Sequence, residues 1–430
     1  MKIWEKGIAV DKKIEQFTIG RDRELDMYLA QFDVQASRAQ ANMLAKVGLI
    51  SKAENQQLQQ GLGELATQIE SGEFTIAEDF EDVHSKIEFY LTEQFGDAGK
   101  KIHTARSRND QVLTAQQLFL KDYTERAAHQ MLALAEVLLQ QAEAHKNVLL
   151  PGYTHFQAAM PSSFGLWFGA YAEHLLLDLA LFEAAHTVAD QNPLGSGAGF
   201  GSSFPIDREM TTRELHFGAV AVSSVGAQLL RGKTERTVAF AVAGLAATLG
   251  KMAYDLVLYN SQDLAFVELP AAFTTGSSIM PHKKNPDVFE LIRARCNTLQ
   301  ALPNTLILAT SNLPSGYHRD FQILKEILFE PLAQLLNILD MLIFALPQLR
   351  VKPDLLNQAK YDAVFTVENI NELIQQGVPF RTAYQQVGQA VNDGTYVPQR
   401  EFQTTHLGSV HNPGLAEIGA KLTAARQQWQ

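Results

Sequence analysis

Hydrophobic residues recur at helical spacing along almost the whole chain, whereas the alternation that is typical of strands is scarce. In the first quarter of the chain this pattern predicts helices over 26–48, 51–71 and 82–95. Ser51 is followed three residues later by Glu54, a capping-box pattern that marks the start of the second of these helices. The N-terminal part is therefore expected to be a small helical domain.

The middle of the chain carries longer periodic runs, separated by short segments rich in Gly, Pro and Ser. They cover 109–146, 163–190, 234–260, 286–312 and 320–346, and shorter runs follow over 353–376, 380–393 and 415–428. Consecutive long helices with many small residues are typical of a bundle of near-antiparallel helices. The predicted fold class is all-α, with an N-terminal domain over 1–105, a central long-helix bundle over 106–350 and a small C-terminal domain over 351–430.

Composition narrows the possible function classes. A chain of 430 residues is too long for one compact core, and its net charge of −11 argues against a general nucleic-acid binder. Cys296 is the only cysteine, so no intrachain disulfide is possible, which fits a cytoplasmic location. The N-terminus shows no secretory signal pattern. The apolar stretch 237–260 is interrupted by Lys251 and Asp255, and we interpret it as a buried bundle helix rather than a membrane span.

Two breaks between predicted helices carry polar groups. The segment HTARSRNDQ over 103–111 contains Arg106 and Arg108, whose forked donors match carboxylates. A helix cap alone needs only the Ser, Asn or Asp, and the cap and an anion site are compatible interpretations. The segment GYTHFQ over 152–157 contains His155, which is able to transfer a proton near neutral pH, although a lone histidine is often structural.

The third break, NPLGSGAGFGSS over 192–203, is too rich in glycine to be helical. It either lets backbone N–H groups approach a ligand or merely turns the chain. The sequence has no P-loop lysine, no GxGxxG after a strand, no HExxH and no metal-ligand spacing among its histidines, so neither a nucleotide cofactor nor a metal is expected. No GxSxG elbow is present, which argues against an α/β-hydrolase.

The fourth break is TGSSIMPHKKNP over 275–286. Gly276 and two serines suit a mobile loop, and Pro286 suits the start of the next helix. The lysines and a helix N-terminus offer positive charge to an anion. A serine here suits proton removal beside a carboxylate, provided that nearby donors stabilise its alkoxide. Glu290 and Arg293 are expected on one helix face, where the carboxylate is placed to orient a histidine. The alternative is a solvated loop.

These segments resemble those of a known family. TGSSIMPHKKNP resembles the signature loop GSSxMPxKxNP of the fumarase/aspartase superfamily, whose members cleave C–N or C–O bonds and release fumarate. Within it the chain is similar to the argininosuccinate lyases: HTARSRNDQ resembles their HTGRSRNDQ, GYTHFQ their GYTHLQ, and NPLGSGAG their NPLGSGA. GYHRDFQ over 316–322 resembles their GYNRDLQ, and GVPFRTAYQQVG resembles their GxPFRxAHxxVG. The matches run from about residue 14 to 393.

The resemblance implies roles for individual residues. The implied catalytic residues are Ser277 as the base, His155 as acid or proton relay, Glu290 as the charge partner of His155, and Lys283 as a group that holds the reacting carboxylate. The implied substrate-binding residues are Ser107, Arg108, Asn109, Thr154, Asn285, Tyr317, Gln322, Lys325 and His84.

The implied activity is the reversible elimination of fumarate from L-argininosuccinate to give L-arginine, without a cofactor, as the last step of arginine biosynthesis. The family forms homotetramers with a twenty-helix core and active sites shared between subunits. Long helices rich in Ala and Leu agree with this, because their apolar faces require neighbours. The alternatives are another fumarate-releasing lyase (adenylosuccinate lyase, fumarase or aspartase) and a non-catalytic structural paralogue. The arginines of RSRND favour argininosuccinate lyase.

The sequence also departs from the family pattern. Ala105 stands where most members have Gly, and His282 where Gln is common. The segment FTIGRDRELD lacks the serine that is expected near that point. VGAQLLRGKTER over 225–236 differs from the usual aspartate-rich segment, and it leaves Arg231 and Arg236 as candidate anion contacts.

Overall fold

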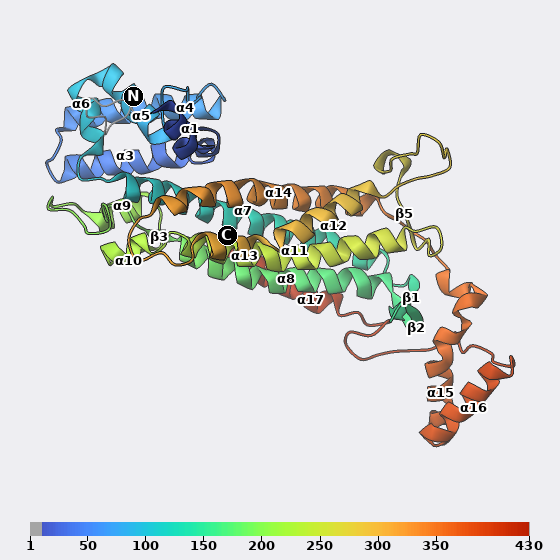
Figure 1. Cartoon of the computed structure of the whole chain (residues 1–430). Coiled ribbons are helices and arrows are strands. Elements are labelled where there is room, and N and C mark those ends of the chain that lie inside the picture. Colours follow the sequence, from blue (N-terminus) through green and yellow to red (C-terminus); the bar gives the residue numbers. More distant parts are fainter. Residues whose placement is uncertain (1–10, 430) are drawn as a thin grey trace. The chain divides into compact units, whose positions relative to one another are not determined.

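The computed structural model describes residues 11–429, which are mostly helical, with three two-stranded sheets (Figure 1). This confirms the all-α prediction. The described chain forms two compact units. The first comprises the residues up to Ala127 together with Ala180–Gly244 and Thr298–Leu335, and the second comprises Ala128–Leu179, Leu245–Asn297 and the residues from Leu336 onward. The division into three domains at 105 and 350 stays a prediction.

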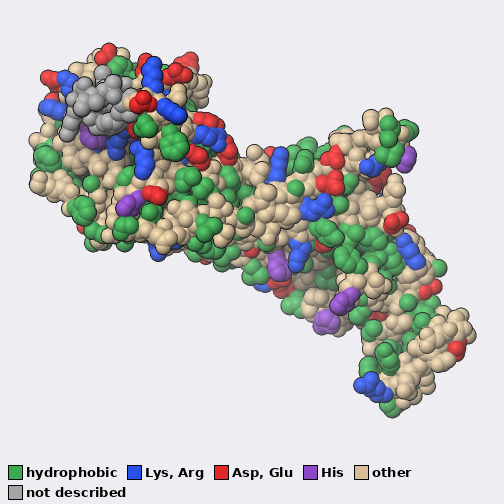
Figure 2. Space-filling view, in the orientation of Figure 1, with side chains coloured by type: hydrophobic (Ala, Val, Ile, Leu, Met, Phe, Trp, Pro, Cys, Tyr) green, Lys and Arg blue, Asp and Glu red, His purple; other side chains and the backbone are tan. Residues whose placement is uncertain are grey.

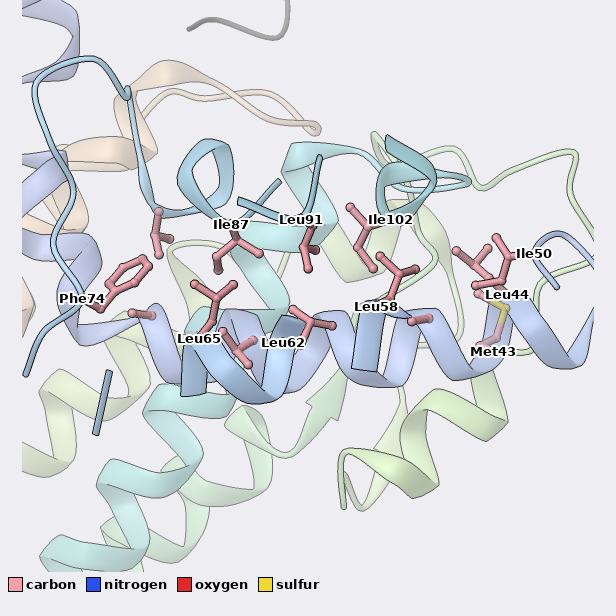
Figure 3. Packing of buried hydrophobic residues seen from close by; sticks show 14 residues of the cluster. Met43, Leu44, Ile50, Leu58, Leu62, Leu65, Phe74, Ile87, Leu91 and Ile102 are labelled. Carbon is pink, nitrogen blue, oxygen red and sulfur yellow. The ribbon is translucent and has the colours of Figure 1, made fainter. Parts of the chain in front are cut away.

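The N-terminal helices belong to the first unit. They are α1 (Lys12–Ile19), α2 (Asp22–Leu25), α3 (Ala30–Lys46), α4 (Lys52–Glu70), α5 (Val83–Phe95) and α6 (Asp97–Lys100). The apolar faces of α3, α4 and α5 bury a shared core in which Leu44, Leu62 and Leu91 are fully buried (Figure 3). Ser51 and Glu54 form the predicted capping box at the start of α4, because each side chain binds the other's backbone N–H.

Long helices make up the middle of the chain. Their bounds are α7 (Arg108–Ala144), α8 (Phe164–Ala189), α11 (Lys233–Tyr259), α12 (Asp287–Leu299) and α14 (Ile323–Ala345). Within the first unit, Phe119 of α7 packs on Phe329 of α14 with ring centroids 4.7 Å apart. Gln116 of α7 donates a hydrogen bond of 2.8 Å to the buried Glu235 of α11. These contacts anchor α7, which begins within the RSRND segment at Arg108.

Short elements complete the first unit. They are the parallel pair β3 (Gln191–Asn192) and β4 (Ala219–Val220), α9 (Arg208–Glu214), α10 (Ser224–Gln228) and α13 (Leu302–Ala309). The glycine-rich segment 192–203 is not helical, as predicted. Arg208 of α9 holds its start by donating to the carbonyl oxygens of Asn192 and Leu194.

The second unit contains an antiparallel hairpin, β1 (Leu149–Thr154) and β2 (Gln157–Ser163), which the helical pattern did not predict. It also contains the pair β5 (Val267–Glu268) and β6 (Arg350–Val351), and the helices α15 (Thr366–Gln375), α16 (Phe380–Asn392) and α17 (Leu415–Gln428). Trp167 of α8 donates to Asp255 of α11 at 3.0 Å. A side chain on Gly250 would meet Cys296 of α12 at 3.2 Å, so this glycine permits close packing of the two helices.

Two predicted helices are wrong in extent. The run 286–312 is divided into α12 and α13, because Pro303 lies in the first turn of α13 and cannot continue a preceding helix. The run 353–376 becomes regular α-helix only at Thr366. Two 3₁₀ segments, Leu355–Asn357 and Ala359–Phe365, precede it, after Asp354 in a left-handed conformation (φ 58°).

Two helical stretches, Lys233–Tyr259 and Arg319–Gln348, are long and apolar enough to cross a membrane by length and composition alone. Half of the most apolar window of the first stretch is buried inside the protein, and core helices satisfy the same criteria. These stretches are therefore weak evidence for a membrane span.

Candidate active site

A polar cavity of about 210 Å³ lies in the first unit. Six of the predicted substrate-binding residues line it: His84, Arg108, Asn109, Tyr317, Gln322 and Lys325. They come from the start of α5, from the first turn of α7, from the segment before α14 and from the first turn of α14 itself. The structure thus brings together residues that lie far apart in the sequence.

Arg108 is held by the start of α5. Its guanidinium donates to the carboxylate of Asp82 at 2.7 Å and to the hydroxyl of Ser85 at 2.6 Å. Asp82 is also the N-cap of α5, where it accepts a hydrogen bond from the backbone N–H of Ser85. Burial by itself would raise the pKa of Asp82, but His84 and Arg108 outweigh it, and the pKa is lowered. Arg108 is therefore oriented by an ionised carboxylate.

Lys325 is clasped by two carboxylates. Its Nζ atom lies 2.6 Å from an oxygen of Asp22 and 2.6 Å from an oxygen of Asp26. Burial favours the neutral amine, but the two carboxylates outweigh it and raise the pKa of Lys325. Burial, opposed by Lys325, raises the pKa of Asp22 to about 6. This wall of the cavity therefore holds a buried ion triad.

His84 forms a buried pair with Asp33 of α3. Burial alone would lower the pKa of His84, but the nearby Asp33 and Asp82 carboxylates raise it. The carboxylate of Asp33 also accepts a hydrogen bond of 3.0 Å from Gln111 of α7. The two carboxylates thus favour the charged form of the imidazole.

Arg319 and Gln322 connect the cavity to α1. Both donate to the carbonyl oxygen of Thr18, at 2.6 and 2.8 Å, and Gln322 also donates to Ile19 at 3.1 Å. The last carbonyls of α1, which lack helical partners, are satisfied in this way. These two residues therefore fix the end of the N-terminal helix beside the cavity.

Ser107 is a predicted substrate-binding residue that does not line this cavity. Its hydroxyl accepts from the backbone N–H of Asn109, and its own N–H donates to Asp110 at 2.9 Å. Asp110 also accepts from the backbone N–H groups of Gly195 and Gly197, at 3.0 and 2.8 Å. The buried Asp110 thus ties the RSRND segment to the glycine-rich segment.

Arg106 does not line the cavity either. It donates to the hydroxyl of Ser37 on α3 at 3.0 Å, so of the two arginines in this segment only Arg108 reaches the cavity wall. Ala105, one residue earlier, has φ 59°, a left-handed conformation that favours glycine. This geometry accounts for the glycine that most family members have at that position.

His155 and Thr154 lie at the tip of the β1–β2 hairpin in the second unit, and both are exposed. The two-residue turn is made by His155 and Phe156, whose φ angles are 55° and 58°. Positive φ at both central residues matches the twist of a hairpin. The turn therefore presents His155 on a defined scaffold.

The segment 275–286 forms an exposed loop at the start of α12. Thr275 and Asn285 pair through their backbones at its base, with N–O distances of 3.3 and 2.9 Å. The Oγ atom of Ser277 accepts hydrogen bonds from the N–H groups of Ile279 and Met280, at 3.3 and 3.2 Å. Lys283 is exposed on the same loop. Backbone donors thus already point at the predicted base.

Glu290 lies in the first turn of α12, and its carboxylate is 3.8 Å from the guanidinium of Arg293. This confirms the prediction that the two side chains share a helix face. No group of three or more metal-ligating side chains is arranged to hold an ion within residues 11–429.

Sequence reasoning missed several residues of the cavity wall: Asp22, Asp26, Glu81, Asp82 and Arg319. Asp22 and Asp26 are one helical turn apart, a spacing that places two carboxylates on one face and was the available signal. Arg319 stands inside the recognised segment GYHRDFQ. Arg231, a candidate anion contact from the sequence, also lines the cavity.

The sequence matches a family described as lyase over residues 5–300, and the chain belongs to this lyase family. Among its relatives, the argininosuccinate lyase of Parabacteroides distasonis is 50% identical over 96% of this chain and 92% of the relative. The argininosuccinate lyase of Bacteroides fragilis is 50% identical over 97% of this chain and 94% of the relative. The argininosuccinate lyase of Xanthomonas campestris pv. campestris is 41% identical over 100% of this chain and 98% of the relative. The chain is thus a member of the argininosuccinate lyase family.

Solved structures agree on the fold. A crystal structure of EDDS lyase in complex with formate matches with a TM-score of 0.75 at 20% identity, covering 98% of this chain and 91% of that one. The class II fumarase of Schistosoma mansoni matches with a TM-score of 0.68 at 17% identity, covering 89% and 91%. At these identities the likeness concerns the fold alone.

Proposed function

We propose that this protein catalyses the reversible elimination of fumarate from L-argininosuccinate to give L-arginine, the last step of arginine biosynthesis. The observation that carries the proposal is the 41–50% identity, over nearly the whole chain, to argininosuccinate lyases. The cavity supports it, because argininosuccinate carries carboxylates, an ammonium and a guanidinium. Cations and carboxylates are both present in the cavity wall.

The chemistry is an elimination. Ser277 as alkoxide takes the proton from the carbon next to the reacting carboxylate, and the resulting charge spreads onto the carboxylate oxygens. Lys283 and Asn285 hold those oxygens, and the backbone N–H groups at 279 and 280 stabilise the serine alkoxide before the transfer. The C–N bond then breaks, its electron pair leaves with the guanidino nitrogen, and a C=C bond forms.

The leaving nitrogen needs a proton, and we assign this role to His155, with Glu290 as its charge partner. Thr154 lies beside His155 at the hairpin tip and is the proposed substrate contact there. In the first unit, Ser107, Arg108, Asn109, Tyr317, Gln322, Lys325 and His84 are the proposed binding residues. The conformation of Ser107 suggests that it acts by shaping the first turn of α7.

We propose that complete sites form only in a homotetramer with a twenty-helix core. Large apolar side chains are exposed on the long helices, including Leu177 of α8, Phe240 of α11 and Phe344 of α14, which are 63%, 53% and 60% exposed. Hydrophobic side chains are also frequent on the face in Figure 2. Apolar surface of this kind is typical of subunit contacts. We also propose a cytoplasmic location, which the single cysteine supports.

The test is fumarate release, followed by the ultraviolet absorbance of its conjugated double bond, with argininosuccinate, adenylosuccinate, malate and aspartate offered side by side. We expect release from argininosuccinate alone, and loss of at least about 1,000-fold in Ser277→Ala, by the scale of catalytic deletions. Ser278→Ala is the matched control and should stay active. Release from another substrate would assign a sister activity, and ligand-dependent melting without release would indicate a non-catalytic paralogue.

A further inference from the structure

The Lys and Arg side chains of the cavity wall differ in whether a carboxylate of the protein pairs with them. Arg108 is paired with Asp82 at 2.7 Å, and Arg319 lies 3.6 Å from Glu81. Lys325 has both Asp22 and Asp26 at 2.6 Å. Three of the four cationic Lys and Arg residues in the wall therefore have a counter-ion from the protein itself.

Arg231 is the fourth, and no carboxylate oxygen lies within 4.0 Å of its guanidinium among residues 11–429. Only 7% of the residue is exposed. One nitrogen donates to the backbone oxygen of Asn109 at 3.3 Å, and the guanidinium lies 5.1 Å from the ring centre of Tyr317. Its Nε atom is buried without a hydrogen-bond partner. A buried guanidinium with an unpartnered N–H group and no close counter-ion destabilises the fold, unless a ligand supplies the missing negative charge and hydrogen-bond acceptors.

Glu235, in the first turn of α11, attracts Arg231 only from a distance, as Asp22 does, and makes no ion pair with it within 4.0 Å. Its carboxylate accepts from Gln116 at 2.8 Å and is fully buried, and burial raises its pKa. The protein therefore leaves Arg231 with unused donor capacity at the cavity.

The local backbone holds Arg231 in place. Gly232 has φ 75°, and a side chain there would meet Thr310 at 3.0 Å and the ring of Phe321 at 3.3 Å. The chain can therefore turn tightly before α11 and pack against the GYHRDFQ segment only because this residue is glycine. This close approach places Arg231 next to Tyr317 and Asn109, two residues of the cavity wall.

We infer that Arg231 is a specificity-determining residue that binds a carboxylate of the substrate in this cavity. The inference rests on the proposed lyase function. A guanidinium presents two parallel N–H groups to a carboxylate, and the flanking Tyr317 ring and Asn109 carbonyl restrict its rotation. Argininosuccinate has a carboxylate on its arginine end and two on its succinate end, and the products separate them.

The experiment compares Arg231→Met, which keeps the length without the charge, with Arg231→Lys, which keeps the charge without the fork. Lys233→Met is the matched control, because Lys233 is an exposed cation two residues further along the chain that does not line the cavity. For Arg231→Met we expect the KM for argininosuccinate to rise about 10- to 100-fold, the scale of a lost charge-assisted hydrogen bond. Arg231→Lys should be intermediate, and Lys233→Met should match wild type.

Product inhibition identifies the carboxylate. Weaker inhibition of Arg231→Met by L-arginine assigns the arginine end, and weaker inhibition by fumarate assigns the succinate end; either result supports the inference. A folded Arg231→Met protein with KM and both inhibition constants within twofold of wild type overturns it. If Arg231→Met does not fold, an unchanged KM in Arg231→Lys overturns it and a raised KM supports it. Wild-type protein that releases no fumarate would instead refute the proposed function.

Discussion

The Nδ1 atom of His84 lies 3.1 Å from the Oδ1 atom of Asp33, and both side chains are buried. Neither charge would persist alone in such surroundings, because burial disfavours each ionised form. Together they shift in opposite directions: the pKa of His84 is raised, and that of Asp33 is lowered. The pair therefore spans the region between the helical core and the cavity wall as two stabilised charges.

Asp33→Asn should destabilise the protein by about 3 kcal/mol at pH 6, because it leaves a buried imidazolium without its partner. The raised pKa of His84 means that its contribution is complete below about pH 6.5 and is lost as the pH rises through its folded pKa. The lowered pKa of Asp33 adds a contribution that is lost only in acid. The difference in urea unfolding free energy between wild type and variant should thus shrink from pH 6 to pH 9. An equal difference at both pH values would contradict this, and the exposed Asp97→Asn is the control.

Lys325→Met should leave Asp22 and Asp26 as buried neighbours without their cation. The expected loss is about 3–5 kcal/mol near pH 8. The pKa of Asp22, already about 6, should rise further, and a raised carboxyl pKa means that stability falls as the pH rises through it. The variant should therefore gain more in melting temperature than wild type between pH 8 and pH 5.5. An equal gain in melting temperature for variant and wild type would show that the triad of Lys325, Asp22 and Asp26 does not set the pH dependence of stability.

Thr275→Val should loosen the loop that carries Ser277. The Thr275 hydroxyl donates to the carboxylate of Asp287, and valine keeps the shape without the donor. Amide hydrogen exchange over 276–284 should become faster, and fumarate release should fall by roughly 3- to 10-fold, the scale of one hydrogen bond. Thr274→Val, next to it, serves as the control. Unchanged amide exchange over 276–284 would show that the hydrogen bond between Thr275 and Asp287 does not order the loop.

Phe156 tests the hairpin turn. Because its φ is 58° and 69% of the residue is exposed, Phe156→Gly should preserve the turn and the activity. Phe156→Val should strain it, since a β-branched residue is disfavoured at positive φ, by about 1–2 kcal/mol. We expect slower fumarate release from the valine variant alone. Equal activity in both variants would mean that the turn does not position His155.

Much of the fold could be predicted because its signals are local. Periodicity placed the predicted runs 109–146 and 163–190 within one or two residues of α7 and α8, and the Ser51–Glu54 pattern marked the start of α4 correctly. The hairpin at 149–163 was not predicted, because its strands and turn are short compared with the long helices that flank it. The break before α13 was not predicted either, because one continuous apolar pattern covers both α12 and α13.

The sequence by itself determined most of the helices and marked four non-helical segments as candidates for the site, because helical periodicity, caps and contiguous motifs depend on neighbouring residues. Only the tertiary structure decided how the charges of the cavity are paired. Lys325 meets Asp26 across 299 positions, and Asp33 meets Gln111 across 78. Burial destabilises a charge and a nearby opposite charge stabilises it, and both depend on side chains that are far away in the sequence. That is why Arg231 stands out only in the folded chain, as the cation of the cavity wall that has no carboxylate oxygen within 4.0 Å among the described residues.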